Sequence, residues 1–314
     1  MGVVVDVVAL LAGVAIIVWG AETFAEHLAS AAARLGVTSF ALALLLAGAE
    51  PEELATAVAA TVRDSPAIAF GDVIGANAAI CLVALGVGAV VAPLPFGTRV
   101  RRYALFGMPV GAVSVLAAWD GRVGRAEGAA LVALYAAYVA AIWIVERRPP
   151  ALGETAELDE AREPSRRVGP EFLLVLAGLA AMVVGASLLV EGVRGLAHAD
   201  DSQARLSLTI VGFATAFELV VLAWSAARRG ISEAVVAAVV GSFAYNATMT
   251  LGAAALVRPL HIADAGHIRW PAVAMLAALA MPIVLAQRDQ QLARHSGVIL
   301  LATYPVFVLI ALAA

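Results

Sequence analysis

Three glutamates stand close together in a part of the chain that is otherwise apolar, the segment LLLAGAEPEELATAV at residues 44–58. Glu50, Glu52 and Glu53 flank a single proline and are the only charged residues between positions 35 and 62. Carboxylate oxygens are the ligands that Ca²⁺ and other hard cations prefer. A charge at the centre of a bilayer costs roughly 3 to more than 10 kcal/mol, so acidic residues there usually line an interior or a water-filled path. These residues therefore indicate cation binding, provided that membrane helices carry them.

A further glutamate, Glu218, follows Glu52 after 166 positions. Without a gap, the same shift also pairs Arg63 with Arg229, Gly75 with Gly241, Gly86 with Gly252 and Pro93 with Pro259. Near the end of each half, a shift of 169 pairs Arg125, Gly128 and Tyr135 with Arg294, Gly297 and Tyr304. Chance matches are common among Ala and Leu but rare among Glu, Arg, Pro and Gly at one constant offset. The chain is therefore predicted to consist of two related halves.

Composition and hydropathy predict the elements that position these glutamates. Of the 314 residues, 62% are hydrophobic and only 14% are charged, which is more apolar than a soluble domain of this size requires. Apolar runs of roughly 18 to 25 residues recur along the chain, each long enough to cross about 30 Å of hydrocarbon as a helix. They lack the alternation of membrane β-strands. We expect an all-α integral membrane protein with ten transmembrane helices at about residues 3–20, 38–62, 68–93, 101–118, 127–146, 171–193, 205–228, 232–257, 268–286 and 296–313.

The long polar segment at residues 146–169 divides these runs into two sets of five. We expect a first five-helix repeat at 1–146, a cytoplasmic linker at 147–169 and a second five-helix repeat at 170–314. An odd number of spans inverts the second repeat relative to the first, an arrangement typical of secondary transporters. All twenty basic residues are arginines, and an outside N-terminus places thirteen of them on the inner side and seven on the outer side. We therefore expect a multi-pass protein of the cell (plasma) membrane with its N-terminus outside.

Two pairs of motifs carry a resemblance to a known family. The first half reads AGAEPEE at residues 47–53 and GDVIGANAAI at 71–80, and the second reads FATAFEL at 213–219 and AAVVGSFAYN at 237–246. These segments resemble the α-repeats of the Ca²⁺/cation antiporter superfamily, which includes the sodium/calcium exchangers. The repeats of that family read roughly G-T-S-x-P-E-L on one helix and G-N-x-I-G-S-N-x-x-N on the next. The resemblance extends over nearly the whole chain.

The resemblance implies a set of ion ligands. Glu52 and Glu218 match the two ion-binding glutamates of the family, and the matching hydroxyl and amide positions are Thr215, Ser242, Asn246 and Asn77. The first half departs from the pattern, with Gly48, Ala49, Ala76 and Ile80 where the family has hydroxyl or amide side chains. Asp72 is a candidate replacement for these lost ligands, or a solvated residue near the start of its helix. Glu53, like Glu50, is either a further ligand or a residue that faces a vestibule.

Spacing supports convergence of these side chains. Ser242 and Asn246 are four residues apart, and Thr215 and Glu218 are three apart, so each pair shares one face of a helix. Ca²⁺ takes about six to eight oxygen ligands, of which two glutamates supply up to four. The less specific interpretations stay open, since buried amides also join helices and small hydroxyls also bond to carbonyls of their own helix.

The sequence predicts a secondary active antiporter that exchanges Ca²⁺ or a similar cation for H⁺ or Na⁺ by alternating access at a midplane site. We expect no enzyme activity and no prosthetic group, with Ca²⁺, Na⁺ or H⁺ as the transported cations. The expected partners are the lipid bilayer and inorganic cations, and no basic patch with interleaved aromatic residues indicates nucleic acid. The altered first half motivates an alternative, a transport-inactive relative that acts as a membrane scaffold or sensor, and the retained pair Glu52 and Glu218 argues against it. An intramembrane enzyme is disfavoured because the chain has neither H-E-x-x-H nor G-x-S-x-G.

Overall fold

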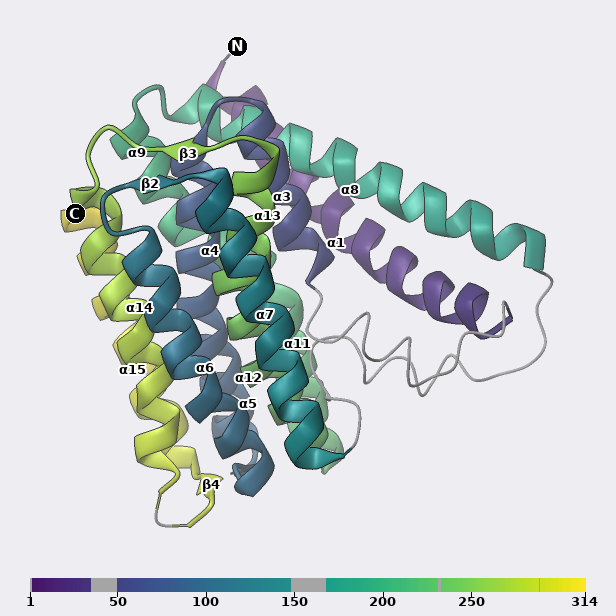
Figure 1. The fold of residues 1–314 in the computed structure, drawn as a ribbon, viewed down its shortest axis with the longest axis vertical. Coiled ribbons are helices and arrows are strands. Elements are labelled where there is room, and N and C mark those ends of the chain that lie inside the picture. The colour runs from purple at the N-terminus through teal and green to yellow at the C-terminus, as the bar shows by residue number, and fades with distance from the viewer. Residues whose placement is uncertain (1, 35–49, 148–167, 231–232, 288) are drawn as a thin grey trace.

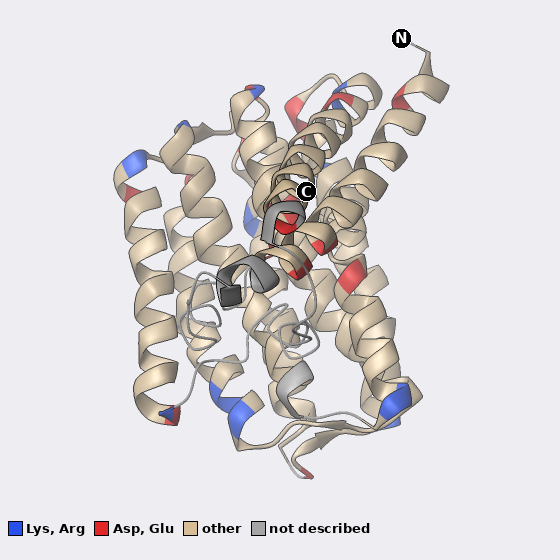
Figure 2. Ribbon diagram, turned by 90° about the vertical axis from the view of Figure 1, so that its right-hand side faces the viewer, with Lys and Arg blue, Asp and Glu red and all other residues tan. Residues whose placement is uncertain are grey.

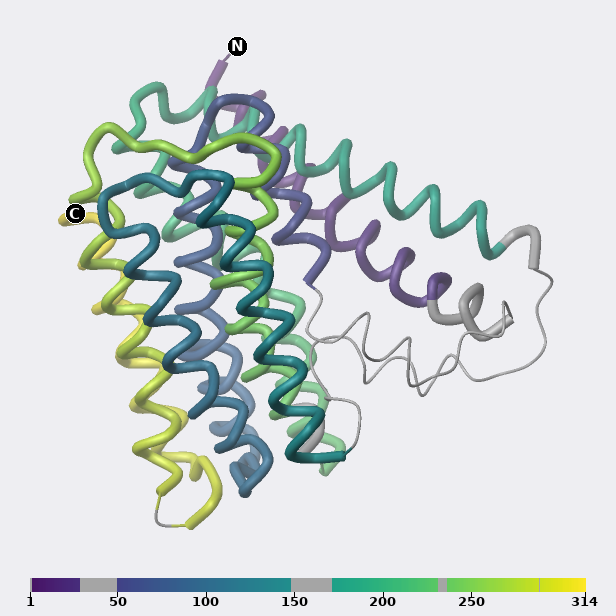
Figure 3. Tube along the Cα trace, in the orientation of Figure 1, coloured from purple at the N-terminus to yellow at the C-terminus, as the bar shows by residue number. Residues whose placement is uncertain are grey.

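The computed structural model describes residues 2–34, 50–147, 168–230, 233–287 and 289–314. Within these ranges the chain is helical apart from two short two-stranded sheets and the connecting turns. Most helices run along the longest axis of the molecule, whereas α1 and α8 form a pair that leans away from the bundle (Figures 1 and 3). The described part of the chain therefore has the all-α architecture that the sequence predicts.

The first half supplies six of the α-helices, one π-helical segment and two strands that the structure describes. These are α1 (Val3–Arg34), α3 (Pro51–Val62), α4 (Pro66–Ala79), π-helical η1 (Ile80–Ala84), α5 (Leu85–Val91), β1 (Leu94–Pro95), α6 (Thr98–Ala117), β2 (Arg122–Val123) and α7 (Arg125–Glu146). The segments α4, η1 and α5 follow one another without a break and together cross the bundle once.

The second half repeats this order in the residues that the structure describes. Its elements are α8 (Val168–Leu196), α9 (Asp200–Leu206), π-helical η3 (Ser207–Val211), α10 (Gly212–Thr215), α11 (Phe217–Arg229), α12 (Glu233–Ala244), π-helical η4 (Tyr245–Thr250), α13 (Leu251–Val257), β3 (Leu260–His261), α14 (Gly266–Leu285), β4 (Gln291–Leu292) and α15 (Arg294–Ala313). Of the three π-helical segments, η1 and η4 each lie in the middle of the third crossing of their half, and their first residues are 165 positions apart.

Eight helical segments of the described chain are long and apolar enough to cross a membrane. They begin at Val3, Pro66, Arg125, Glu171, Asp200, Val236, Gly266 and Arg294. These eight coincide with eight of the ten predicted runs. Of the other two, the run at 38–62 lies outside the described residues up to position 49, and the run at 101–118 corresponds to α6.

Two predicted boundaries are wrong. The first run was placed at 3–20, but α1 continues to Arg34 because residues 21–34 contain neither Gly nor Pro and are rich in Ala, the strongest helix former. The run predicted at 205–228 begins at Asp200 and is interrupted at Ala216, where α10 ends and α11 begins. The sequence shows no proline there, and hydropathy alone does not reveal such a break.

The two halves pack against each other through matching contacts. Strand β1 pairs with β4, and β2 pairs with β3, so each strand of one half pairs with the non-equivalent strand of the other. Helix α5 packs on α15 and α7 on α13 in the same exchanged manner. A Cβ atom on Gly297 would lie 2.7 Å from the carbonyl oxygen of Gly86, and one on Gly128 would lie 2.7 Å from that of Gly252. These paired close approaches show that the two halves share one packing plan.

The core of the bundle is formed by two crossings. Along Pro66–Val91 and Val236–Val257, 89% of the most apolar window is buried, against 28% along α7 and α15. Helices α7 and α15 therefore present most of their surface to the surroundings, while α4 and α12 are enclosed by protein. Polar groups on α4 and α12 lie where lipid cannot reach them.

The charges separate along the bundle axis. Figure 2 shows most arginines near the two ends and several acidic positions near mid-height. Both termini lie toward the end that carries β2 and β3 (Figure 1), where His267 bonds to the carbonyl oxygen of Ala314. Arg147 caps α7 at the opposite end, the end of β1 and β4.

The α7–α13 crossing gives a test of this packing. Gly128→Ala places a methyl group against the Gly252 carbonyl, so the helices must separate, and we expect a loss of about 1 to 3 kcal/mol, the usual cost of overpacking. Gly107→Ala is the matched control, since its Cβ would lie 3.6 Å from the nearest atom, a side-chain carbon of Leu279. Thermal unfolding of the purified protein in detergent measures both. Equal melting temperatures for the two variants would contradict the close approach.

Candidate functional site

The glutamate trio lies at the start of α3. Glu50 is the residue before the helix, Pro51 takes its first position, and Glu52 and Glu53 complete the first turn. Proline suits this position because its missing N–H would have no partner inside the helix. The free backbone N–H groups at a helix N-terminus favour negative charge, so the fold places the acidic residues where α3 stabilises them. This local stabilisation explains how a glutamate-rich turn persists in an apolar protein.

The three carboxylates form one group. Glu50 and Glu52 are each 1% exposed and Glu53 is completely buried. One oxygen from each lies within 4.8 Å of one from each of the others, a spacing suited to a shared metal ion. Like charges this close oppose one another in a low-dielectric interior. The trio therefore requires a cation or bound protons to balance it.

Asp72 adds a fourth carboxylate from α4. It is completely buried, and the hydroxyl of Thr215 donates a hydrogen bond to its Oδ1 over 3.0 Å. Its Oδ2 has no hydrogen-bond partner among the described residues. Asp72 is also near enough to Glu53 for the two to interact electrostatically. The sequence left two roles open for Asp72, and its burial removes the solvated one.

Close helix packing brings Asp72 to Thr215. Helix α4 lies against η3 and α10, and a Cβ atom on Gly75 or Gly212 would collide with the backbone of the facing segment. Only residues without side chains permit this approach. The two glycines thus set the distance between the halves at the level of the site.

Ser242 on α12 connects the second half to the trio. Its hydroxyl donates to Oε1 of Glu50 in a short contact, and its oxygen lies 3.2 Å from the carbonyl oxygen of Ala238 one turn earlier. Thr215 likewise lies near its own backbone, 3.2 Å from the Val211 oxygen. Both hydroxyls therefore combine a local helix contact with a contact to a carboxylate of the first half.

Glu218 lies in the first turn of α11 and is half-buried. It is not a member of the trio; it lines a cavity of about 520 Å³ whose wall Glu50 also forms. The other residues that line this cavity are Val18, Glu22, Phe217, Leu219, Val221, Leu222, Ser225 and Arg229. Glu50 therefore lies between the two predicted glutamates: it lines the cavity with Glu218 and belongs to the trio with Glu52.

The two predicted amide ligands are completely buried. Asn246 lies in η4, where Thr250 donates to its Oδ1 over 3.4 Å, and its Nδ2 has no partner among the described residues. Asn77 on α4 donates to Sδ of Met275 on α14 over 3.5 Å, and its Oδ1 has no partner among the described residues. A carbonyl oxygen without a donor suits a cation ligand, so Asn77 retains both interpretations.

The structure brings five of the eight predicted site residues into one connected group. Glu52, Glu53, Asp72, Thr215 and Ser242 belong to it, with Glu218 at its border and the two amides on the neighbouring helices. Glu50 is the residue that the predicted ligand set lacks. The signal for it was the Glu-Pro-Glu-Glu sequence itself, since a third carboxylate at an apolar helix start needs the same explanation as the other two.

This fold defines an integral membrane protein that encloses a group of buried carboxylates. The chain belongs to the family described as sodium/calcium exchanger protein, whose model matches residues 5–144 and 171–313. That match confirms the superfamily that the motifs predict, a family of cation exchangers.

Individual relatives extend over the whole chain. An uncharacterized membrane protein of Methanocaldococcus jannaschii is 25% identical over 292 residues, which cover 91% of this chain and 89% of that protein. The putative antiporter CaxA of Alkalimonas amylolytica is 22% identical over 94% of this chain and 95% of its own. A structure of the sodium-calcium exchanger NCX_Mj, soaked with Na⁺ and Sr²⁺, aligns with a TM-score of 0.63, 22% identity and coverage of 98% and 99%. The fold is thus that of a sodium-calcium exchanger.

The carboxylates are tested by charge removal with shape retained. We expect Glu52→Gln and Glu218→Gln each to reduce cation uptake into proteoliposomes to background, because each removes a charged ligand from the site. Glu53→Gln is expected to be milder, since its equivalent in the second half is the apolar Leu219. Asp200→Asn, at the exposed start of α9, serves as the control and should transport like the parent. Parental uptake by both Glu52→Gln and Glu218→Gln would refute the assignment.

Proposed function

We propose that the protein is a secondary active antiporter that exchanges Ca²⁺ or a similar cation for H⁺ or Na⁺ by alternating access. The observation that carries this proposal is the buried group of carboxylates at the junction of the two halves, to which Thr215 and Ser242 donate from the opposite half. Glutamate and aspartate oxygens together with hydroxyl oxygens form the ligand set that Ca²⁺ prefers. The relatives named as a sodium-calcium exchanger and a putative antiporter support the same activity.

The proposed architecture is ten transmembrane helices in two inverted five-helix repeats, at 1–146 and 170–314. The exchanged pairing of β1 with β4 and of β2 with β3 supports it, as do the equivalent helix contacts of the two halves. In such repeats, substrate sites lie near the midplane where the copies meet. We further propose a location in the plasma membrane with the N-terminus outside and the linker at 147–169 in the cytoplasm, of which residues 148–167 lie outside the described ranges.

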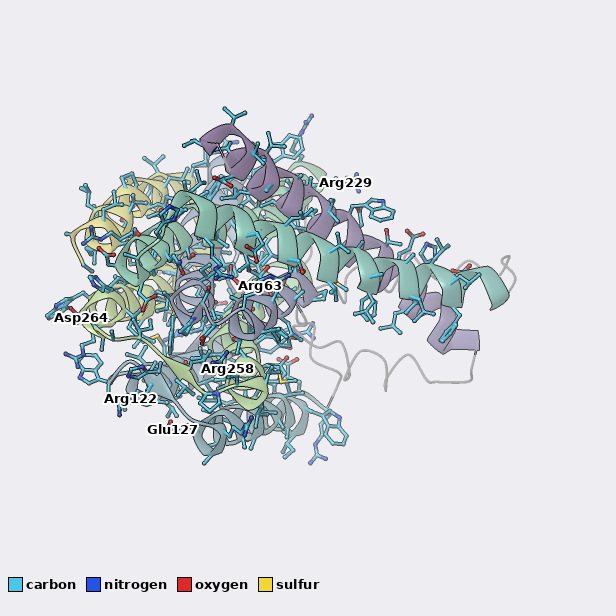
Figure 4. The ribbon with its side chains drawn as sticks, turned by 90° about the horizontal axis from the view of Figure 1, so that it is seen from above. Arg63, Arg122, Glu127, Arg229, Arg258 and Asp264 are labelled. Carbon is cyan, nitrogen blue, oxygen red and sulfur yellow. The ribbon has the colours of Figure 1, made fainter. Side chains whose placement is uncertain are left out.

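Alternating access is supported by a difference between the two sides of the α1–α8 pair. On one side α3 packs along α8, and Nε of Arg63 lies 3.1 Å from Oε1 of Glu191. On the other side, the cavity with Glu218 separates α1 from α11 and extends to Arg229. Arg63 and Arg229 are equivalent in the two halves, and they lie on opposite sides of α8 (Figure 4). Among the described residues, the side near Arg63 is therefore bridged by an ion pair, whereas the side near Arg229 borders the cavity.

The proposed exchange cycle follows from this asymmetry. A cation enters through the cavity and reaches the carboxylates from the end that carries β1 and β4, which is the cytoplasmic end in the proposed orientation. Opening of the opposite side requires the Arg63–Glu191 ion pair to separate and α8 to move from α3. Because the halves share one packing plan, the same contacts can form between α11 and α1 after the change. The carboxylates then face the other end of the bundle.

The alternative of a transport-inactive scaffold is motivated by the loss of ligands at Ala76 and Ile80 in the first half. Against it, the first half retains four buried carboxyl groups that no ordinary structural role requires in an apolar interior. Cation flux in proteoliposomes distinguishes the two functions, because a scaffold produces none.

The access asymmetry gives a prediction with a matched control. In a Cys81→Ala background, Ser225→Cys places a thiol on the cavity wall, and Ala59→Cys places one at the equivalent position of α3, on the closed side. We expect a membrane-impermeant thiol reagent applied from the cytoplasmic side to modify the first variant much faster than the second. Equal modification rates from that side would contradict the proposed path.

We propose H⁺ in preference to Na⁺ as the counter-ion. Several Na⁺ ions would need hydroxyl and amide oxygens from both halves, and Ala76 and Ile80 in the first half provide none. Carboxyl groups crowded in a low-dielectric site are instead suited to binding protons, which an incoming cation displaces. Proteoliposomes with enclosed Ca²⁺ and pH indicators are expected to take up Ca²⁺ when a proton gradient is imposed. Uptake driven by a Na⁺ gradient at clamped pH, without a response to the proton gradient, would reverse this preference.

A further inference from the structure

The acidic residues of the site are distributed unequally between the halves. At the constant offset of 166, Glu50 corresponds to Ala216, Glu53 to Leu219 and Asp72 to Ala238, whereas Glu52 and Glu218 correspond to each other. Three of the four carboxylates of the first half thus have apolar residues at the equivalent positions of the second half. The additional negative charge belongs to the first half alone.

The hydroxyl groups show the opposite distribution. Thr215 corresponds to Ala49 and Ser242 to Ala76, so each hydroxyl lies in the second half and an alanine in the first. The structure joins the two sets, because Ser242 donates to Glu50 and Thr215 donates to Asp72. Two of the three additional acids, Glu50 and Asp72, are therefore matched with a hydroxyl that the other half supplies. The first half has exchanged neutral ligands for charged ones, and the second half orients them.

Glu50 occupies the position that connects the buried acids to the cavity. It shares the trio with Glu52 and Glu53, and it lines the 520 Å³ cavity beside Glu218. Behind it, neither oxygen of Glu53 receives a hydrogen bond from a donor group of the described residues, and the same holds for Oδ2 of the buried Asp72. Buried acceptors without donors are rare and indicate a ligand that is bound during function. A cation that enters from the cavity meets Glu50 before it reaches these oxygens.

We infer that Glu50 is a cation ligand at the boundary between the cavity and the buried trio, and that it makes the site selective for divalent over monovalent cations. This inference rests on the proposed function, because it concerns the same site. The attraction between a cation and fixed carboxylates is proportional to the charge of the cation, so each added carboxylate favours a divalent ion more than a monovalent one. Neutral hydroxyl and amide oxygens attract a cation only through their dipoles, so each contributes less to this discrimination than a carboxylate does.

Terbium luminescence measures the binding directly. Tb³⁺ replaces Ca²⁺ at oxygen-rich sites and emits when a neighbouring aromatic ring transfers energy to it. Tyr135 lies near enough to Glu50 to interact with its charge, and it packs edge-on against Tyr245 at 5.3 Å between ring centroids. Tyrosine excitation of the purified protein should therefore yield Tb³⁺ emission that added Ca²⁺ displaces and that Na⁺ displaces only weakly.

In Glu50→Gln we expect the Ca²⁺ concentration that displaces Tb³⁺ to rise at least about tenfold, since the number of charged ligands sets cation affinity. The ratio of this Ca²⁺ concentration to the Na⁺ concentration that displaces the same amount of Tb³⁺ should also rise. Asp200→Asn, at the exposed start of α9 and outside the cavity, is the control and should remain within about twofold of the parent. Ser242→Ala should weaken Ca²⁺ binding by about threefold, and much less when Glu50→Gln is already present, because the two side chains act as a pair.

Parental Ca²⁺ affinity and selectivity in Glu50→Gln, with affinity lost in Glu52→Gln, would overturn the inference. If Glu50→Gln does not fold, as judged by size-exclusion chromatography, Ser242→Ala decides the question: unchanged displacement by Ca²⁺ overturns the inference, and weakened displacement supports it. Failure of the proposed antiport gives a different pattern. Tb³⁺ and Ca²⁺ would then bind as described while proteoliposomes show no flux.

Discussion

The free energy cost of placing carboxylates in an apolar interior governs the arrangement of this protein. Glu50, Glu52, Glu53 and Asp72 are all at most 1% exposed, and the arginines lie near the ends of the bundle. The start of α3 and two donated hydroxyls reduce that cost but do not balance four negative charges. The balance must come from cations or protons that enter and leave. A transported ion is thus part of what makes the folded state electrostatically acceptable.

Close packing of the two halves follows from the same requirement. A site that excludes lipid must be enclosed by protein, and α4 and α12, the most buried crossings, provide that enclosure. The hydroxyl of Thr215 reaches Asp72 where Gly75 and Gly212 let the backbones of α4 and of the η3–α10 segment touch. The π-helical segments η1 and η4 lie in the crossings of α4 and α12, and η3 lies in the crossing that also contains α11. Such segments are frequent at functional sites. The site therefore depends on small residues and helix irregularities that contribute no ligand themselves.

Much of this could be predicted from the sequence because the signals are local or periodic. Hydropathy predicts the apolar crossings, and the matched Glu, Arg, Pro and Gly positions predict two related halves. The contact of Gly86 with Gly297 was not predicted, because it joins positions that are not equivalent in the two halves. The end of α1 was misplaced because a helix that continues beyond the apolar core leaves no mark in hydropathy. The sequence left the role of Glu50 open between a ligand and a vestibule residue, because its contact with Ser242 joins residues 192 positions apart and no local pattern reveals it.

The contrast between a symmetric backbone and asymmetric side chains separates two properties of the protein. Equivalent strand pairs and helix contacts give the two halves interchangeable packing partners, and a conformational change between two such arrangements needs little difference in energy. Under the proposed function the ligands face no such restriction, because a bound ion would contact both halves at once and its affinity would depend on the sum of their ligands. The first half can therefore exchange neutral ligands for acids without disturbing the backbone relation, provided that the second half supplies hydroxyls to orient them. Ion selectivity can thus change in one half while the mechanism of access remains common to both.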